Sequence, residues 1–267
     1  MSEDIQLSTA DKVVTALLLT SVGGFVDAVG YISLFQIFTA NMSGNSIHVG
    51  IDLGGFDVAG LSRPACAIVS YVSAIILTRI VLEIANRAGV QRIASLTLSV
   101  EALLLVIFAQ ATPVMHGGQI AEQHSLGYFA LVATLAFAMG VQTGTLTHLG
   151  PLTVYTTFVT GTLTKFSESF ARMVFWVHDS RRSGMPMPDI VRHLRTQADA
   201  KASALLLGTW LCYVTGAALG TLSKRQWELK AIYAPVVVLA ALVILDRVRP
   251  LADVEEQHQR ASLKHPG

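Results

Sequence analysis

Polar side chains gather in one short stretch, FTANMSGNSIHVG at residues 38–50, which follows a long apolar run. The run contains Asp27, and Tyr31 lies four residues further on, on the same face of a helix. A carboxylate inside a membrane helix can bind a cation or carry a proton, and the alternative is an acid that hydrogen-bonds to the asparagines of the stretch. We interpret Asp27 and Tyr31, with the core of the stretch, as a candidate substrate- or ion-binding site. The core residues are Asn41, Ser43, Gly44 and Asn45.

A second polar stretch lies in the other half of the chain, within GVQTGTLTHLGPLTVYTTFVTGTLTKF at residues 140–166. Residues 43–45 (SGN) have a counterpart in residues 160–162 (TGT), and further on residues 70–74 (SYVSA) resemble residues 212–216 (CYVTG). Because the matches occur in the same order, they predict two sequence-related halves. The candidate site residues of the second half are Gln142, Thr157, Thr160, Gly161 and Thr162.

The elements that carry these residues are predicted to be membrane-spanning helices. Charged residues make up only 14% of the chain, against about a quarter in a typical soluble domain, and the mean hydropathy is +0.54. Apolar runs of roughly 20 residues are long enough to cross a bilayer as helices. The runs are approximately 13–34, 64–86, 93–112, 126–147, 202–222 and 231–247. We therefore expect an all-α, polytopic helical membrane protein of about six transmembrane helices.

Two further segments, 35–53 and 152–176, have the length of a span but are too polar to face lipid. Unwound backbone at membrane depth is tolerated only where protein or a watery cavity satisfies its polar groups. We expect Gly44 and Gly161 to adopt positive φ at two breaks, giving re-entrant or broken segments that meet near the midplane. Paired segments of this kind favour a transporter-like site. Close packing of small residues is the alternative, equally open for the threonines.

The distribution of lysine and arginine predicts cytoplasmic N- and C-termini, with Lys224, Arg225 and Lys230 as exceptions. The resulting organisation is a tail at 1–12, a first half at 13–112, a second half at 113–247 with a polar insertion at about 178–200, and a tail at 248–267. With six spans and two re-entrant segments, each half has an odd number of spans, so that the halves are inverted. The alternative is that the two polar segments cross fully, which gives eight spans. Part of the insertion, 188–200, is either an amphipathic surface helix or a solvated linker.

Several other polar residues are interpreted as structural or as weaker functional candidates. Glu101 lies in an apolar run and ranks second to Asp27 as a functional acid. Lys165, Glu168 and Arg172 share one helical face and favour an interfacial charge network. Arg79 and Glu83 have the spacing of a local ion pair. His48 and His148 are interpreted as packing residues.

The residues quoted above also carry a family resemblance. GGFVDAVGYISLFQIFTANMSGNSIHVG, residues 23–50, and the TTFVTGTLT core of residues 140–166 resemble the YoaK family of bacterial membrane proteins, the DUF1275 domain. Two departures are the polar insertion before residue 200 and the pair Gln142-Thr143. The resemblance implies a polytopic protein of the bacterial inner membrane and supplies no substrate.

Two functions remain open from the sequence. One is a small secondary transporter or facilitator in which Asp27 couples a proton or another cation. The other is a non-transporting membrane interaction or lipid-binding protein whose polar motifs serve helix packing. The sequence contains no GxSxG, HExxH or nucleotide-binding pattern, so we expect no enzyme.

The expected partners are the lipid bilayer and an unknown small solute or ion, with a homo-oligomer left open. The net charge of +1 disfavours nucleic acid. Cys66 and Cys212 lie inside predicted helices, where they suggest no metal site, and we expect no cofactor.

Overall fold

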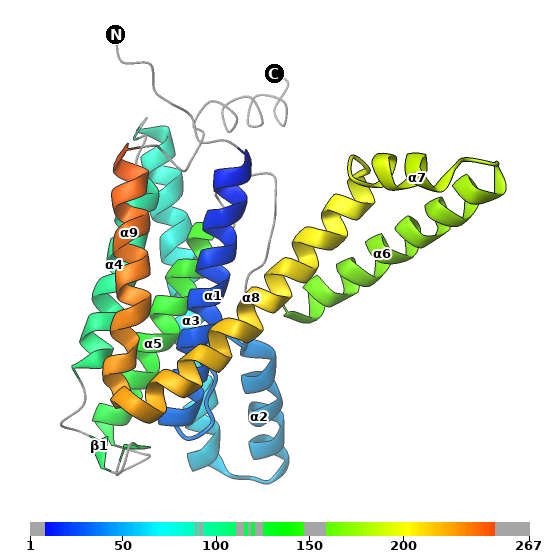
Figure 1. Ribbon diagram of the computed structural model, residues 1–267. Coiled ribbons are helices and arrows are strands. Elements are labelled where there is room, and N and C mark those ends of the chain that lie inside the picture. The colour runs from blue at the N-terminus through cyan, green and yellow to red at the C-terminus, as the bar shows by residue number, and fades with distance from the viewer. Residues whose placement is uncertain are drawn as a thin grey trace, which may run out of the picture.

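Figure 1 shows a computed structural model of the chain, in which residues 9–88, 90, 93–110, 115–116, 119–120, 125–146 and 159–248 are described. The helices in chain order are α1 (Thr9–Ser33), α2 (Met42–Gly54), α3 (Val58–Arg87), α4 (Ile93–Ala109), α5 (Leu126–Leu146), α6 (Val159–Arg182), α7 (Met187–Leu194), α8 (Ala198–Trp227), the 3₁₀ turn η2 (Glu228–Ile232) and α9 (Tyr233–Val248). Strands β1 (Met115–His116) and β2 (Gln119–Ile120) form a short antiparallel pair between α4 and α5. The described part of the chain is therefore almost entirely helical.

Within the described residues, four segments are long and apolar enough to cross a membrane. They are Asp11–Ser33, Val58–Arg87, Leu126–Leu146 and Ala198–Val248, and the last of them joins α8, η2 and α9. Helix α4 adds a shorter apolar helix. Each of the six predicted runs falls on a helix, and the chain is a helical membrane protein.

Helix α3 begins at Val58, earlier than the predicted start at residue 64. The Asp57 side chain caps the helix by accepting a hydrogen bond from Gly60 N at 2.8 Å. Pro64 consequently lies inside the helix rather than at its start.

Two pairs of parallel helices form the centre of the bundle. Helix α1 packs along α8, and a Cβ at Gly216 would lie 2.1 Å from the carbonyl oxygen of Ser21. Helix α5 packs along α3, and a Cβ at Gly140 would lie 2.5 Å from the carbonyl oxygen of Tyr71. Glycine at these positions lets the two backbones of each pair approach closely.

Hydrogen bonds between helices fix the directions in which the two pairs run. Helix α5 is antiparallel to α1, because Tyr128 Oη donates to the carbonyl oxygen of Leu34 at 3.2 Å and Gln142 Nε2 donates to that of Leu19 at 2.9 Å. The α1–α8 pair therefore descends in Figure 1 while the α3–α5 pair ascends.

Helices α4 and α9 pack antiparallel beside the two central pairs. At one end of this contact, the backbone N–H and Oγ of Ser95 both donate to Oδ2 of the buried Asp246. At the other end, Gln110 Nε2 donates to Tyr233 Oη at 2.7 Å. Polar contacts thus hold both ends of this helix pair in register.

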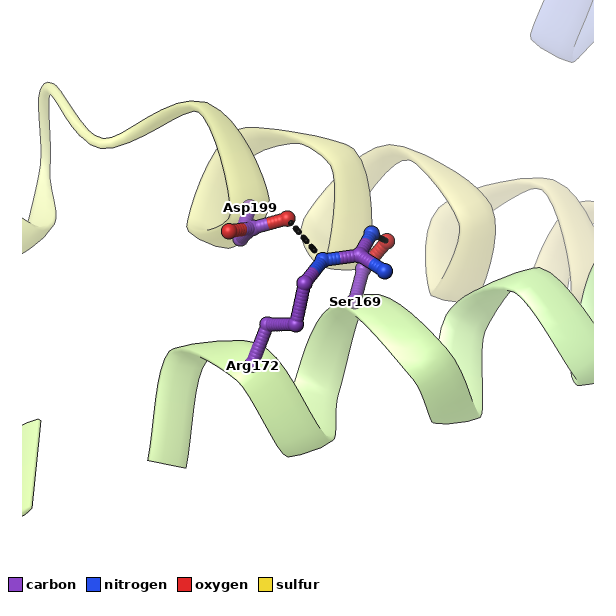
Figure 2. A network of polar contacts seen from close by, with 3 residues as sticks. All are labelled: Ser169, Arg172 and Asp199. Atoms are coloured by element: carbon purple, nitrogen blue, oxygen red, sulfur yellow. Dashed lines mark hydrogen bonds and ion pairs between the residues drawn. The ribbon is translucent and has the colours of Figure 1, made fainter. Parts of the chain in front are cut away.

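Helices α6, α7 and the first part of α8 form an arm that extends away from the bundle (Figure 1). Arg172 on α6 donates from Nε to Asp199 Oδ1 on α8 at 2.9 Å and from an Nη to Ser169 Oγ at 3.2 Å (Figure 2). The predicted charged face of α6 thus joins α6 to α8 through Arg172. The predicted insertion is not a plain linker, since it contains the end of α6 and the whole of α7, where Ile190 is buried.

Candidate functional site

The first polar stretch contains a break between two helices. Helix α1 ends at Ser33 and α2 begins at Met42, and between them Phe35 and Gln36 adopt left-handed backbone at φ 51° and 64°. The N–H of Gln36 donates to the carbonyl oxygen of Tyr31 at 3.0 Å, which closes the end of α1 in a Schellman-type turn. The predicted break in the helix is present, but it precedes the asparagine-rich core.

The expectation that Gly44 and Gly161 form the breaks is wrong. Gly44 lies in the first turn of α2 and Gly161 in the first turn of α6, and among the described residues Gly184 is the glycine with positive φ. Close packing explains Gly44 better than backbone freedom does, because a Cβ there would lie 2.7 Å from the ring of Phe38.

Asp27 is the anchor of the broken segment. Its Oδ1 accepts hydrogen bonds from the Thr39 N–H at 2.7 Å, the Thr39 hydroxyl at 3.1 Å and the Ala40 N–H at 2.9 Å. Its Oδ2 accepts from Tyr213 Oη on α8 at 2.8 Å, and the residue is buried. The carboxylate thus supplies acceptors to two backbone N–H groups outside any helix. This is the structural alternative weighed for Asp27, with Thr39 and Ala40 as its partners in place of the asparagines.

The two asparagines also act on the backbone of the break. Asn45 is fully buried, accepts from the Phe38 N–H at 3.0 Å and donates to the Phe38 carbonyl oxygen at 2.7 Å. Asn41 caps α2, since its Oδ1 accepts from Gly44 N at 3.3 Å and from Ser43 Oγ at 2.7 Å. The Tyr31 ring packs against Phe38, with ring centroids 4.5 Å apart. The sequence-predicted residues of the first half are therefore brought together around one loop.

The second polar stretch behaves differently in the described residues. From Val159 onward it is a regular helix, with Thr160 exposed and Thr162 buried, whereas Thr157 and His148 lie outside the described residues. Helix α2 packs mainly on α3 and helix α6 mainly on α8. The predicted meeting of the two segments is thus not found there, because each segment packs on its own long helix.

A cavity of about 410 Å³ opens beside the break. Its walls come from three elements: the loop after α1, α2 and the start of α3. The lining residues are Phe35, Gln36, Ile37, His48, Asp52, Arg63 and Pro64. The sequence interpretation missed Asp52 and Arg63, which lie outside the quoted core, and treated His48 as a packing residue. Both missed residues are charged and follow closely after the polar stretch at residues 38–50, and this position in the sequence could have identified them.

Other buried polar groups lie within the apolar helices. Glu101 on α4 is fully buried, and neither of its carboxyl oxygens has a hydrogen-bond partner among the described residues. Gln142 is also fully buried; its Nε2 has a partner, whereas its Oε1 has none in the part of the chain that the structure describes. The sequence interpretation passed over the buried Asp246 on α9, which the rule applied to Asp27 would have found. At the exposed end of α3, Glu83 pairs with Arg87 at 2.8 Å, not with Arg79 as predicted.

Comparison with known proteins gives the chain a family. The family model described as "Protein of unknown function (DUF1275)" matches residues 15–245. The chain belongs to the DUF1275 family. Within the family, this chain is 23% identical over 232 residues to the UPF0700 transmembrane protein YoaK of Bacillus subtilis (strain 168), a match that covers 87% of this chain and 92% of that protein. No solved structure matches the chain. The DUF1275 match includes the break, Asp27, Asp52 and Arg63, so the cavity lies within the family region.

Proposed function

We propose that this DUF1275 chain is a small secondary transporter or facilitator of the inner membrane, whose solute enters the cavity beside the α1–α2 break. One observation carries the proposal: a cavity of about 410 Å³ bears His48, Asp52 and Arg63 at a helix break in a chain of apolar helices. Broken helices next to polar cavities are the usual places where transporters bind solutes at membrane depth.

The pairing of the helices supports a six-span arrangement of two inverted halves. The parallel pair α1–α8 runs opposite to the parallel pair α5–α3, as a two-fold axis in the membrane plane would require. Tyr213 Oη donates to Asp27 between α8 and α1, and Tyr71 Oη donates to Thr143 Oγ1 at 2.9 Å between α3 and α5. The two tyrosines occupy matching positions in the sequence repeat. Cytoplasmic N- and C-termini belong to the same proposal.

Asp27 has a different role in this proposal from the one expected of a coupling acid. All four of its hydrogen bonds hold the break or α8 in place, so it shapes the cavity wall. Glu101 is the acid left to carry a proton, because no group of the described residues hydrogen-bonds to its carboxyl oxygens. We assign proton coupling, where it occurs, to Glu101 in preference to Asp27.

The test is solute uptake by purified protein reconstituted in liposomes, with and without a pH gradient, over a library of anionic, cationic, zwitterionic and neutral solutes. We expect at least one solute to accumulate above the level of protein-free liposomes, and uptake to fall about tenfold in Asp52→Asn. Glu83→Gln is the matched control, since it changes an exposed acid outside the cavity. Folded protein that moves no solute of any class would contradict the proposal.

The second candidate function is a membrane interaction or lipid-binding protein without transport. It is favoured by the saturation of Asp27 and Asn45 with hydrogen bonds to the chain's own groups. It predicts that every substitution at the break changes stability and assembly together and that no solute crosses. Neither function requires catalysis or a cofactor.

A further inference from the structure

The outer end of the α6–α8 arm, residues 178–201, concentrates basic side chains. It contains four arginines and one lysine against three acids, and one of these acids, Asp199, already pairs with Arg172. The five basic side chains are exposed, and none of them forms an ion pair or a side-chain hydrogen bond within the described part of the chain. They are Arg181, Arg182, Arg192, Arg195 and Lys201. The helix dipoles favour arginine at the ends of α6 and α7, but the guanidinium groups remain in the open.

A tight turn after α6 brings these residues together from two helices. Gly184 adopts left-handed backbone at φ 82°, and its N–H donates to the Arg181 carbonyl oxygen at 3.1 Å. The Met185 N–H donates to the carbonyl oxygen of Ser180, also at 3.1 Å. The chain then reverses into α7, which contacts α6 and buries Ile190. The arginines of α6 and those of α7 therefore lie at one end of the arm (Figure 1).

Exposed apolar side chains accompany the arginines on both helices. On α7, Met187 and Val191 are 49% and 47% exposed, and with Arg195 they follow one line at four-residue spacing. On α6, Phe175 is 67% exposed and lies two helical turns before Arg182 on the same face. Arginine beside exposed apolar side chains is typical of helices that lie in the boundary between lipid headgroups and acyl chains.

The outer end of the arm also lies next to a segment that can cross the membrane. The apolar run of α8 begins at residue 202, directly after Lys201, and Ala198–Val248 is long and apolar enough to span a bilayer. All five basic residues precede this run by roughly 20 residues or fewer, the range in which lysine and arginine lie near the membrane surface. In Figure 1, α7 lies at the same end of the molecule as the start of α1, another such segment.

We infer that the outer end of the arm binds anionic phospholipid headgroups, with its arginines at the lipid phosphates and its exposed apolar side chains in the boundary beneath them. Guanidinium groups bind phosphate oxygens in bidentate geometry. Clusters of about four to eight basic residues next to a span attract anionic lipid, and the exposed Met187, Val191 and Phe175 match the apolar boundary of a bilayer. This surface acts with or without transport, because none of its residues lines the cavity beside the break.

The experiment measures which lipid surrounds the outer end of the arm. Full-length protein carries a fluorophore on Ser183→Cys, in the exposed turn after α6, with Cys66→Ser and Cys212→Ser removing the two native thiols. One copy per nanodisc is reconstituted in phosphatidylcholine with an equal small fraction of spin-labelled phosphatidylglycerol or spin-labelled phosphatidylcholine, each of which quenches the fluorophore at short range. We expect phosphatidylglycerol to quench at least twofold more strongly. About 1 M salt, where the Debye length is roughly 3 Å, should remove most of the difference.

Substitutions of the four arginines in residues 178–201 locate the effect. Replacing all four by glutamine is expected to make the two lipids quench equally, whereas replacing all four by lysine keeps the charge and should retain at least half of the preference. Arg87→Gln is the matched control, since it removes an exposed arginine that already pairs with Glu83 at 2.8 Å, and it should leave the preference unchanged. The unfolding temperature of each variant checks that the bundle is intact. The salt dependence tests the inference by itself where the glutamine variant does not fold.

Equal quenching by the two lipids with all four arginines present would overturn the inference. A preference that the glutamine substitutions leave intact, or that Arg87→Gln also removes, would overturn it as well. Equal quenching that changes only in nanodiscs with two copies would assign this surface to a second copy of the chain instead of to lipid.

Discussion

The hydroxyl of Tyr213 on α8 donates a hydrogen bond to Oδ2 of Asp27 on α1 at 2.8 Å. The same carboxylate accepts from two backbone N–H groups of the loop that follows α1. One buried acid therefore joins a helix–helix contact to the break that borders the cavity.

Asp27→Ala is expected to lower the free energy of unfolding by about 3 kcal/mol or more. The substitution leaves two buried N–H groups without an acceptor, and each unsatisfied group costs about 1–3 kcal/mol. Asp27→Asn should cost clearly less, because the remaining Oδ1 still accepts from Thr39 and Ala40. Thermal unfolding of the purified variants in detergent measures both. An Asp27→Asn variant that unfolds like the wild type but has lost all pH-dependent uptake would instead assign coupling to Asp27.

The two repeat-related tyrosines should differ in the cost of losing their hydroxyl groups. Tyr213→Phe removes a donor to a carboxylate and should cost about 1.5–3 kcal/mol, the range for hydrogen bonds to charged groups. Tyr71→Phe removes a donor to the neutral Thr143 hydroxyl and should cost about 0.5–1.5 kcal/mol. Equilibrium unfolding of the two variants side by side gives the comparison. Equal costs would show that the charge on Asp27 adds nothing to its contact.

Gly216→Ala should strongly destabilise the bundle. A Cβ at this position would lie 2.1 Å from the carbonyl oxygen of Ser21, so α8 and α1 would have to separate. Gly208→Ala on the same helix is the matched control, because the nearest atom to its Cβ would be Leu17 Cδ2 at 4.0 Å. The control should be neutral or more stable by up to about 1 kcal/mol, the difference in helix propensity. Monodispersity on size exclusion and unfolding temperature check both variants, and a well-folded Gly216→Ala would mean that the α1–α8 contact is not so close.

The ion pair between Arg172 and Asp199 should contribute little to stability. Its side chains are 59% and 30% exposed, and exposed pairs are worth about 0–1 kcal/mol. A double-mutant cycle with Arg172→Gln and Asp199→Asn measures the coupling at low and high salt. A coupling energy well above 1 kcal/mol would indicate that the Arg172–Asp199 pair is more buried in the membrane-embedded or assembled protein than it is in the single chain.

Glu101→Gln is expected to leave stability unchanged or to raise it. The carboxyl group is fully buried and makes no hydrogen bond to the described residues, so its replacement breaks no hydrogen bond seen there and takes a potential charge out of the apolar interior. Under the transport proposal, the same variant should lose the dependence of uptake on a pH gradient. Unfolding and liposome uptake are measured on the same preparation. A loss of several kcal/mol would show that Glu101 has a structural partner outside the described residues, and unchanged gradient dependence would reject the coupling role.

The sequence determined the membrane class, the positions of the spanning helices and the existence of a break after α1. These features follow from local quantities: the length of the apolar runs and the concentration of amides and hydroxyls after residue 38. The family resemblance also came from contiguous motifs, and the match over residues 15–245 confirms it. Short-range information was sufficient because a helix in lipid must satisfy its own backbone.

Tertiary structure decided what the polar residues do. Residue type alone made Gly44 a plausible break, but the ring of Phe38 packs against it. Residue type also made Asp27 a plausible coupling acid, but its carboxylate accepts hydrogen bonds from the backbone N–H groups of Thr39 and Ala40. Asp52 and Arg63 are separated by a turn and a helix start, and only the folding of α2 onto α3 brings them to one cavity. Sequence spacing cannot supply such relationships, since they depend on how helices pack against each other rather than on the periodicity within any one of them.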